Sequence, residues 1–183
     1  MKVLIMNGDD GTGAHGLDPW LSRFGVRLLG KGHTIQELRL RDLGIKRCLG
    51  CWNCWWTSPG VCIHKDGMSD VLKEIIAADL VFWGIPLVLG AQSSLAKHCQ
   101  DRMIPLVHPY ITLVKGECHH RARYAHYPRH ALALASGSGD TTEDLDLAAL
   151  LFSRFALNLK SGVDYWTTTA TGPEEAADAA IGA

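Results

Sequence analysis

The sequence lacks an excess of charge of either sign and lacks a long uninterrupted apolar run. Its 183 residues carry 18 Lys and Arg against 19 Asp and Glu, a net charge of −1 at pH 7. A surface that follows nucleic-acid phosphates needs a basic excess, so nucleic acid is not the expected partner. The longest apolar stretch, 77–90, is broken by Asp79, Gly84 and Pro86 and cannot span a bilayer, so we expect no membrane partner.

The N-terminal residues also lack the pattern of a secretory signal. The segment MKVLIMNGDDG turns acidic too early for such a signal, which predicts a cytoplasmic protein. In that reducing compartment, six cysteines indicate metal binding or catalysis more readily than disulfides. The length of the chain suits a single domain over residues 1–183 with a sizeable core.

Four of the six cysteines are gathered in one segment, CLGCWNCWWTSPGVC. They are Cys48, Cys51, Cys54 and Cys62, in the spacing C-x2-C-x2-C-x7-C. Three close cysteines followed by a more distant one are compatible with four thiolates on an iron–sulfur cluster. Zinc sites with four thiolates usually have two separated C-x2-C pairs, and free thiols or a redox disulfide are the third reading. The spacing alone leaves these readings open.

Apolar runs typical of buried strands alternate with stretches of helical periodicity along the chain. The patterns predict strands at 2–6, 33–40, 80–84, 130–135 and 163–168, and helices at 17–29, 66–78, 93–103, 142–156 and 174–180. This alternation predicts an α/β fold, a parallel sheet with helices on both faces. Five strands suit the flavodoxin-like doubly wound order 2-1-3-4-5.

Ligands of a doubly wound sheet bind at the carboxyl ends of its strands, beside the switch point. The predicted site therefore consists of the loops after the first, third and fourth strands, 8–16, 86–94 and 136–140. Two other segments stand apart, a cysteine-rich loop at 47–63 and a long loop at 105–129. The long loop is rich in His and Arg, and we expect a lid, a partner surface or a hairpin there.

Several segments, taken in order, resemble the flavodoxin-like NAD(P)H-dependent FMN oxidoreductases, and among them the iron–sulfur flavoproteins. They are LRLRDLGIKRCLGCWNCW, CIHKDGM, ADLVFWGIPLVLG and SSLAKHCQDR, and the resemblance runs from Met1 to about Thr169. It implies a flavin-centred oxidoreductase or electron-transfer protein that passes electrons from NAD(P)H to a small-molecule or protein acceptor. It also implies a homo-oligomer and a 4Fe–4S cluster, held by the four cysteines close to the flavin.

The resemblance further implies which residues line the FMN. They are Asn7, Gly8, Thr12, Gly13 and His15 of the first loop, Pro86, Leu87, Val88, Leu89, Gly90, Ala91, Gln92 and Ser93 of the second, and Ser136, Gly137, Ser138 and Gly139 of the third. From the residues alone, 90–93 is equally an ordinary strand-to-helix turn capped by Ser93. Arg102, on the predicted helix after this loop, is either a binding group for the nicotinamide cofactor's phosphates or a charge in an ion pair.

The first loop departs from the family pattern Gly-Ser-Pro-Arg. Asp9, Asp10 and Gly11 stand where the family has serine, proline and arginine. Carboxylates repel a phosphate, so either they turn away, or FMN binds weakly, or the phosphate pocket has been lost. The last case predicts a flavin-free flavodoxin-like subunit or scaffold in a larger complex.

Paired aspartates after a first strand also resemble the metal-binding start of the stationary-phase-survival nucleotidases. In that reading Asp9 and Asp10 hold a divalent ion for a metal-dependent phosphatase. The third reading is structural, in which both aspartates are solvated turn residues that cap the following helix.

Overall fold

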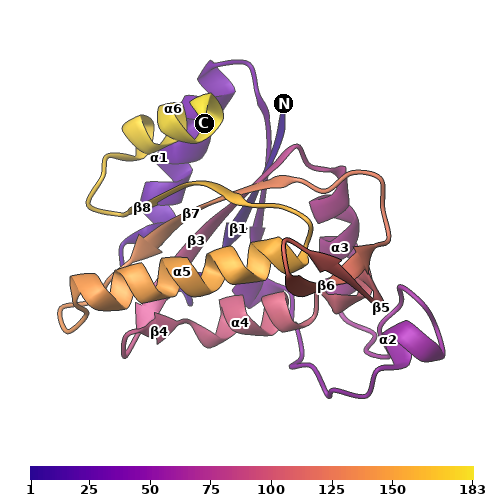
Figure 1. Ribbon diagram of the computed structural model, residues 1–183. Helices are drawn as coiled ribbons and strands as arrows, with labels where there is room; N and C mark the ends of the chain where they lie inside the picture. The colour runs from indigo at the N-terminus through magenta and orange to yellow at the C-terminus, as the bar shows by residue number, and fades with distance from the viewer.

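A central sheet with helices on both faces organises the whole chain, and the computed structural model describes residues 1–183 (Figure 1). The strands are β1 (Lys2–Asn7), β2 (Thr34–Arg39), β3 (Leu80–Val88), β4 (Ala91–Gln92), β5 (Val107–Val114), β6 (Glu117–Ala122), β7 (Arg129–Ala135) and β8 (Val163–Thr168). The α-helices are α1 (Leu17–Gly30), α2 (Asn53–Trp56), α3 (Met68–Ala77), α4 (Ser94–Asp101), α5 (Thr142–Asn158) and α6 (Pro173–Gly182). Short 3-10 turns follow β2 at Leu40–Asp42 and precede β5 at Ile104–Leu106.

The sheet has the order β2-β1-β3-β7-β8, and all four pairings along it are parallel. This is the predicted order 2-1-3-4-5, because β7 and β8 are the fourth and fifth strands of that pattern. The strands β1, β3 and β7 are almost wholly buried, as expected for strands that are covered on both faces. Their carboxyl ends lie at one edge of the sheet, where the three predicted loops begin.

Two apolar cores lie on opposite sides of the sheet. One core packs α3, α4 and α5 against the sheet residues whose side chains point to that face, among them Leu4, Val81 and Leu132. The other packs α1 and α6 against the alternate residues, among them Val3, Phe82 and Ala131. Successive residues of a strand face opposite ways, so one continuous apolar strand supplies both cores. No helix in the structure combines the length and the apolar character that a bilayer crossing requires.

The third strand is longer than its sequence pattern predicts. A strand at 80–84 with a loop from Pro86 was expected, but β3 continues to Val88 and turns back as β4. Pro86 and Leu87 are buried, and Pro86 is paired in register with Ala135 of β7. The carbonyl of Pro86 also accepts the amide of Ser93 at 2.9 Å, so the proline ends neither the strand nor its pairing.

The long loop at 105–129 is an antiparallel hairpin of β5 and β6, one of the three forms expected for it. The hairpin lies outside the main sheet, beside the carboxyl-terminal half of α5 (Figure 1). Arg154 of α5 forms an ion pair with Glu117 of β6 at 2.8 Å, which ties the hairpin to the body of the protein.

A buried ion pair holds the cysteine-rich loop to the same body. Arg102, at the end of α4, is 2% exposed and binds both carboxylate oxygens of Asp66 at 2.9 Å. Its guanidinium also donates to the carbonyl of Lys46 at 2.8 Å, and Asp66 accepts the amides of Lys46 and Met68. The Arg102 guanidinium holds the pKa of the Asp66 carboxyl well below its usual range. The pair therefore joins α4 to both ends of the cysteine-rich segment.

We predict that Asp66→Asn destabilises the protein by about 3–5 kcal/mol, because it leaves the Arg102 charge buried without a partner. The pKa of Asp66 is depressed in the folded state, so its contribution is present above its unfolded pKa of about 4 and is lost as the pH falls through the folded value. The free energy of unfolding in urea should therefore differ most between the two proteins above about pH 5, with the difference shrinking below about pH 4.

The matched control is Asp101→Asn, which removes the exposed ion pair between Lys97 and Asp101 on α4. An exposed pair at this helical spacing contributes less than about 0.5 kcal/mol. Equal losses in the two variants would contradict the role assigned to the buried pair.

Candidate active site

An open cleft of about 570 Å³ lies at the carboxyl edge of the sheet. Its volume is in the range of small-molecule sites. The loops after β1, β3 and β7 all contribute to it, and its lining is His15, Leu87, Val88, Leu89, Gly90, Gly137, Ser138, Gly139, Asp140 and Asp144. The cleft is therefore at the switch point, where ligands of doubly wound sheets bind.

Eight of the residues expected at the flavin line this cleft: His15, Leu87 to Gly90, and Gly137 to Gly139. The other nine lie outside its lining: Asn7, Gly8, Thr12, Gly13, Pro86, Ala91, Gln92, Ser93 and Ser136. Gln92 bonds instead to the carbonyl of Ala148 on α5 and to Gln100. Ser93 is the N-cap of α4, its hydroxyl accepting the amide of Ala96, as the turn reading expected.

The turn between β3 and β4 has an unusual backbone. Leu89 has φ +53°, in the left-handed region that non-glycine residues rarely adopt, and its side chain is 99% exposed at the rim of the cleft. At Gly90, φ is +74°, and a Cβ would lie 2.6 Å from Oδ1 of Asp144. A side chain at position 90 would be strained and would crowd Asp144, and Leu89 itself lies at the rim of the cleft at a backbone cost.

Asp140 joins two of the loops, and the sequence patterns did not single it out. Its carboxylate accepts the amide of Gly90 at 3.0 Å and the amide of Gly137 at 2.7 Å. The next carboxylate, Asp144, belongs to the capping box of α5 and accepts the amide of Thr141. The amides of Ser138 and Gly139 bond to nothing within the chain and are the donors that this loop leaves for a ligand.

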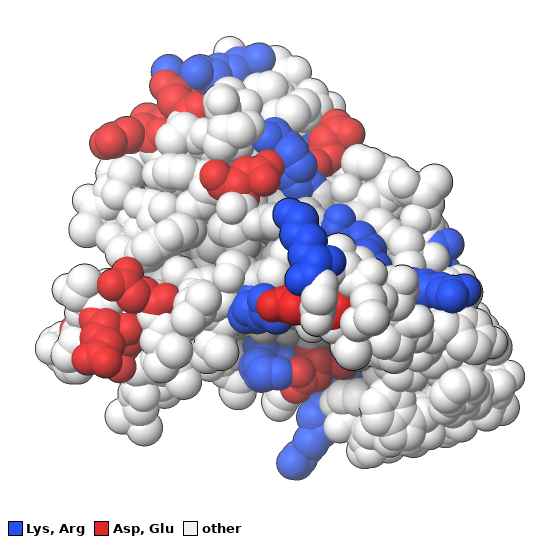
Figure 2. All heavy atoms as spheres, in the orientation of Figure 1, with Lys and Arg blue, Asp and Glu red and all other residues white.

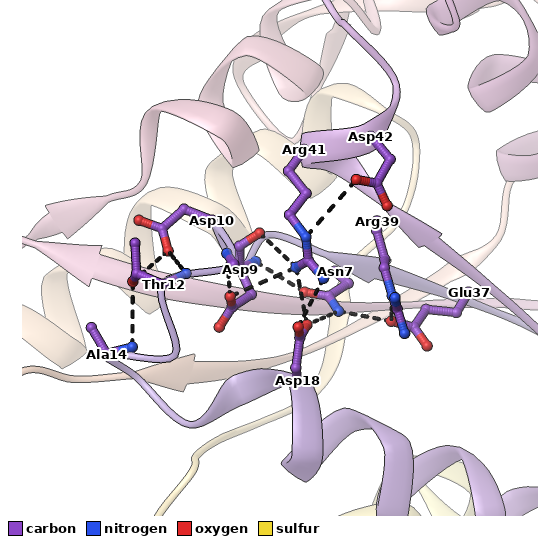
Figure 3. A network of polar contacts seen from close by, with 11 residues as sticks. Asn7, Asp9, Asp10, Thr12, Ala14, Asp18, Glu37, Arg39, Arg41 and Asp42 are labelled. Atoms are coloured by element: carbon purple, nitrogen blue, oxygen red, sulfur yellow. Dashed lines mark hydrogen bonds and ion pairs between the residues drawn. The ribbon is translucent and has the colours of Figure 1, made fainter.

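In the first loop, backbone amides donate to the carboxylates of Asp9 and Asp10 of the same loop (Figure 3). Oδ1 of Asp9 accepts the amide of Gly11 at 2.7 Å, and Oδ1 of Asp10 accepts the amide and the hydroxyl of Thr12 at 2.9 and 2.7 Å. The amide and hydroxyl of Thr12 lower the pKa of Asp10, which is therefore ionised at neutral pH. Two backbone amides that could have contributed to a phosphate site, those of Gly11 and Thr12, are thus bound by internal carboxylates.

Arg41 is the cation nearest to this loop, and it too has partners (Figure 3). It donates to the carbonyl of Asp9 at 3.1 Å and binds both carboxylate oxygens of Asp18 at 3.1 and 2.8 Å. This bond, together with the amide of Asn7, lowers the pKa of Asp18. Asn7 also donates to Glu37, so its side chain belongs to the network at the ends of β1 and β2.

The cleft and the first loop fit the two ends of a nucleotide-like cofactor differently. The cleft has an apolar rim, free amides and His15, whose Nδ1 is buried without a partner, and these suit a planar ring with polar edges. The loop has two carboxylates, which already bind the amides of Gly11 and Thr12, and this does not suit a phosphate. The carboxylates of Asp9 and Asp10 bind different backbone amides of the loop. The structure has no group of three metal-ligating side chains, so the metal-dependent phosphatase hypothesis receives no support.

The four clustered cysteines line one cavity of about 20 Å³, together with Arg102, His64, Ile104 and Pro105. Cys54 is buried, and burial raises the pKa of its thiol, with Cys62 and Cys48 adding to the effect. Nε of Arg102 and Nε2 of His64 are buried in this region without a hydrogen-bond partner. The donor set of four thiols beside a buried guanidinium is chemically suited to an anionic thiolate centre.

The cavity is not the site of a single metal ion. No three His, Cys, Asp or Glu side chains approach closely enough to share an ion, so the zinc reading receives no support. No disulfide joins the cysteines, which are all free. Cys99 lies apart from them, fully buried among apolar residues, and burial raises its pKa to about 12. It is the small core residue that its helical position indicates.

The position of the cysteines corrects one expectation. The resemblance placed them close to the flavin, but α2 lies at the opposite end of the molecule from β4 and the start of α5 (Figure 1). The two cavities share no residue. Trp55 fixes the loop there, because its Nε1 donates to the carbonyl of Ile104 at 2.9 Å and its ring packs on His120 of β6.

Comparisons with known proteins bear on the family and the fold. No family model matches the chain. An iron-sulfur flavoprotein of Archaeoglobus fulgidus is 34% identical over 71 residues, 39% of this chain and 34% of that protein. One from Methanocaldococcus jannaschii is 35% identical over 72 residues, 39% of this chain and 36% of that protein. These matches span about a third of the length of the curated relatives.

Solved structures match over the whole chain at low identity. An FMN-dependent NADH-azoreductase of Bacillus anthracis, in complex with FMN, is 17% identical with a TM-score of 0.64, over 100% of this chain and 95% of that one. An NAD(P)H:quinone oxidoreductase of Methanothermobacter marburgensis is 15% identical with a TM-score of 0.68, over 98% and 95%. The chain therefore has the flavodoxin-like fold of these reductases, and 39% of it is similar in sequence to iron–sulfur flavoproteins, as its motifs predicted.

Proposed function

We propose that the protein is a flavin-dependent NAD(P)H oxidoreductase or electron-transfer flavoprotein. The proposed flavin is FMN, which a solved structure of the same fold contains. The observation that carries this proposal is the cleft at the switch point, built from the loops after β1, β3 and β7. Solved structures of the same fold include FMN-dependent reductases, which supports the assignment. The electron acceptor is a small molecule or a protein.

In this proposal the chain orients and shields the flavin, whose ring supplies the redox chemistry when it is bound. Leu87, Val88 and Leu89 form the apolar side of the cleft and exclude water from one face of the ring. The free amides of Ser138 and Gly139 donate to acceptor atoms at the ring edge. His15, with its unpartnered Nδ1, is the one titratable group of the first loop that lines the cleft.

We further propose that Cys48, Cys51, Cys54 and Cys62 hold an iron–sulfur cluster of the 4Fe–4S type. The shared cavity and the buried Arg102 beside Cys62 support this, because a guanidinium offsets the negative charge of a thiolate-bound cluster. In a cubane each thiolate binds a different iron, so its ligands lie farther apart than those of one ion. The loop must open outward to admit a cluster, and Cys51 is already exposed.

The test of the cluster compares two exposed cysteines after anaerobic reconstitution with iron and sulfide. Cys51→Ser, in the cavity, should lose most of the bound iron and sulfide and the broad visible absorbance that bleaches on reduction. Cys118→Ser, outside the cavity, should retain them. Wild-type protein that takes up no stoichiometric sulfide would contradict the cluster and leave the thiols free.

A flavin-free scaffold or subunit is the second candidate function. It is favoured by the carboxylates of Asp9, Asp10 and Asp140, which occupy loop amides that otherwise face a flavin. Flavin titration separates the two functions, because a scaffold binds neither FMN nor riboflavin. The cytoplasmic location expected from the sequence stays a prediction.

We also propose a homodimer formed through α5. Leu147, Leu150 and Leu151 are half or more exposed on one face of this helix, and Leu113 of the neighbouring hairpin is 71% exposed. Apolar side chains grouped in this way are typical of protein interfaces.

The double variant Leu150→Glu with Leu151→Glu should sediment as a monomer under conditions in which the wild type is a dimer, because buried carboxylates oppose association. Val26→Glu is the control, since Val26 is 66% exposed on α1 and lies outside this face. Analytical ultracentrifugation measures all three proteins. A monomeric wild type, or a dimer that survives the double substitution, would refute the interface.

A further inference from the structure

We propose that the cleft recognises the ring and ribityl part of a flavin and gains no affinity from its phosphate, so that riboflavin binds as tightly as FMN. This inference rests on the proposed flavin function. In doubly wound folds the phosphate of a bound nucleotide is held by amides at a helix N-terminus after a strand. The loop that leads from β1 into α1 is that position here.

Six of the nine backbone amides of the loop 8–16 donate within the chain, and those of Asp10, Gly13 and His15 do not. Those of Gly11 and Thr12 donate to the carboxylates of Asp9 and Asp10, and that of Ala14 donates to the hydroxyl of Thr12. The amide of Gly16, at the start of α1, donates to the carbonyl of Gly13. At Gly11 and Thr12 a phosphate would have to displace internal carboxylates that are already well bonded, so it gains little from these two amides.

None of the three loops of the cleft, 8–16, 87–93 and 136–140, contains a Lys or Arg, and His15 is their one basic side chain. Arg41 comes nearest, but Asp18 and the carbonyl of Asp9 hold its guanidinium (Figure 3). Figure 2 shows acidic side chains gathered at the end of the molecule where α5 begins, with no Lys or Arg visible among them. An incoming dianion therefore meets like charge without a counter-ion.

The ring end of the cleft is free of this conflict. The apolar lining of Leu87, Val88 and Leu89 and the amides of Ser138 and Gly139 remain available, and none of them requires a charged ligand. The ring therefore meets an apolar lining and free amides, whereas the phosphate meets carboxylates. We expect the ring to contribute to the affinity for FMN and the phosphate to contribute nothing.

Fluorescence titration of the full chain with riboflavin and with FMN tests this inference. We expect equal dissociation constants within about threefold at low salt, with FMN binding strengthening as salt screens the repulsion and riboflavin binding unchanged. Asp10→Asn keeps an acceptor for Thr12 but removes the charge, and should improve FMN affinity by roughly three- to tenfold without changing that of riboflavin. Asp70→Asn, an exposed carboxylate on α3, should change neither.

The outcomes separate this inference from the function beneath it. FMN bound ten times or more tightly than riboflavin by the wild type would overturn the inference and leave the flavin function standing. Failure of both flavins to bind would overturn the flavin function, and the inference with it. An unchanged FMN affinity in Asp10→Asn would show that this carboxylate does not oppose the phosphate, which also overturns the inference.

Discussion

The buried pair of Arg102 and Asp66 is the constraint on which the arrangement of the two cavities depends. A guanidinium that is 2% exposed has to find partners within the protein, and here its two terminal nitrogens bind Asp66 and the carbonyl of Lys46, while its Nε has no partner. Those partners flank the cysteine-rich segment. Because an unpaired buried charge is so costly, the pair fixes the segment against the end of α4, away from the cleft. Arg102 also lines the cavity of the four cysteines, so the residue that anchors the loop also places a positive charge beside that cavity.

The fold could be predicted almost entirely from apolar periodicity, because both cores are built from it. Runs such as that of β1 are apolar on successive residues, which only a strand covered on both faces requires. The prediction was wrong at Pro86, where a proline indicated a loop. Its missing amide is harmless there, since its carbonyl still bonds to Ser93 and β3 continues into β4. The hairpin at β5 and β6 was one of several expectations, since its strands lack a clear apolar alternation.

The location of the cleft followed from topology, but its chemistry did not follow from the sequence. Strand order alone indicates that the loops after β1, β3 and β7 meet. Which carboxylate binds which amide depends on contacts between distant segments, such as that of Asp140 with Gly90, and no local pattern encodes them. Arg102 was expected to be a cofactor-binding group or a charge in an ion pair, and it forms an ion pair with Asp66, but a buried one that the sequence did not indicate. The two residues are 36 positions apart in the sequence, and no local pattern pairs them.

The loop between β1 and α1 shows that a shared fold does not require shared recognition of the cofactor's phosphate. Backbone amides at the start of α1 are a general consequence of placing a helix after a strand, and any anion can satisfy them. In this chain Asp9 and Asp10 supply carboxylates that bind the amides of Gly11 and Thr12 in the loop before α1, whereas the first turn of α1 has no side-chain cap. A carboxylate that is part of the chain loses no translational entropy when it binds these amides. A free phosphate does lose it, so the phosphate competes at a disadvantage. The fold is thereby kept, while two of the amides that could bind a phosphorylated ligand are already bound by carboxylates of the chain.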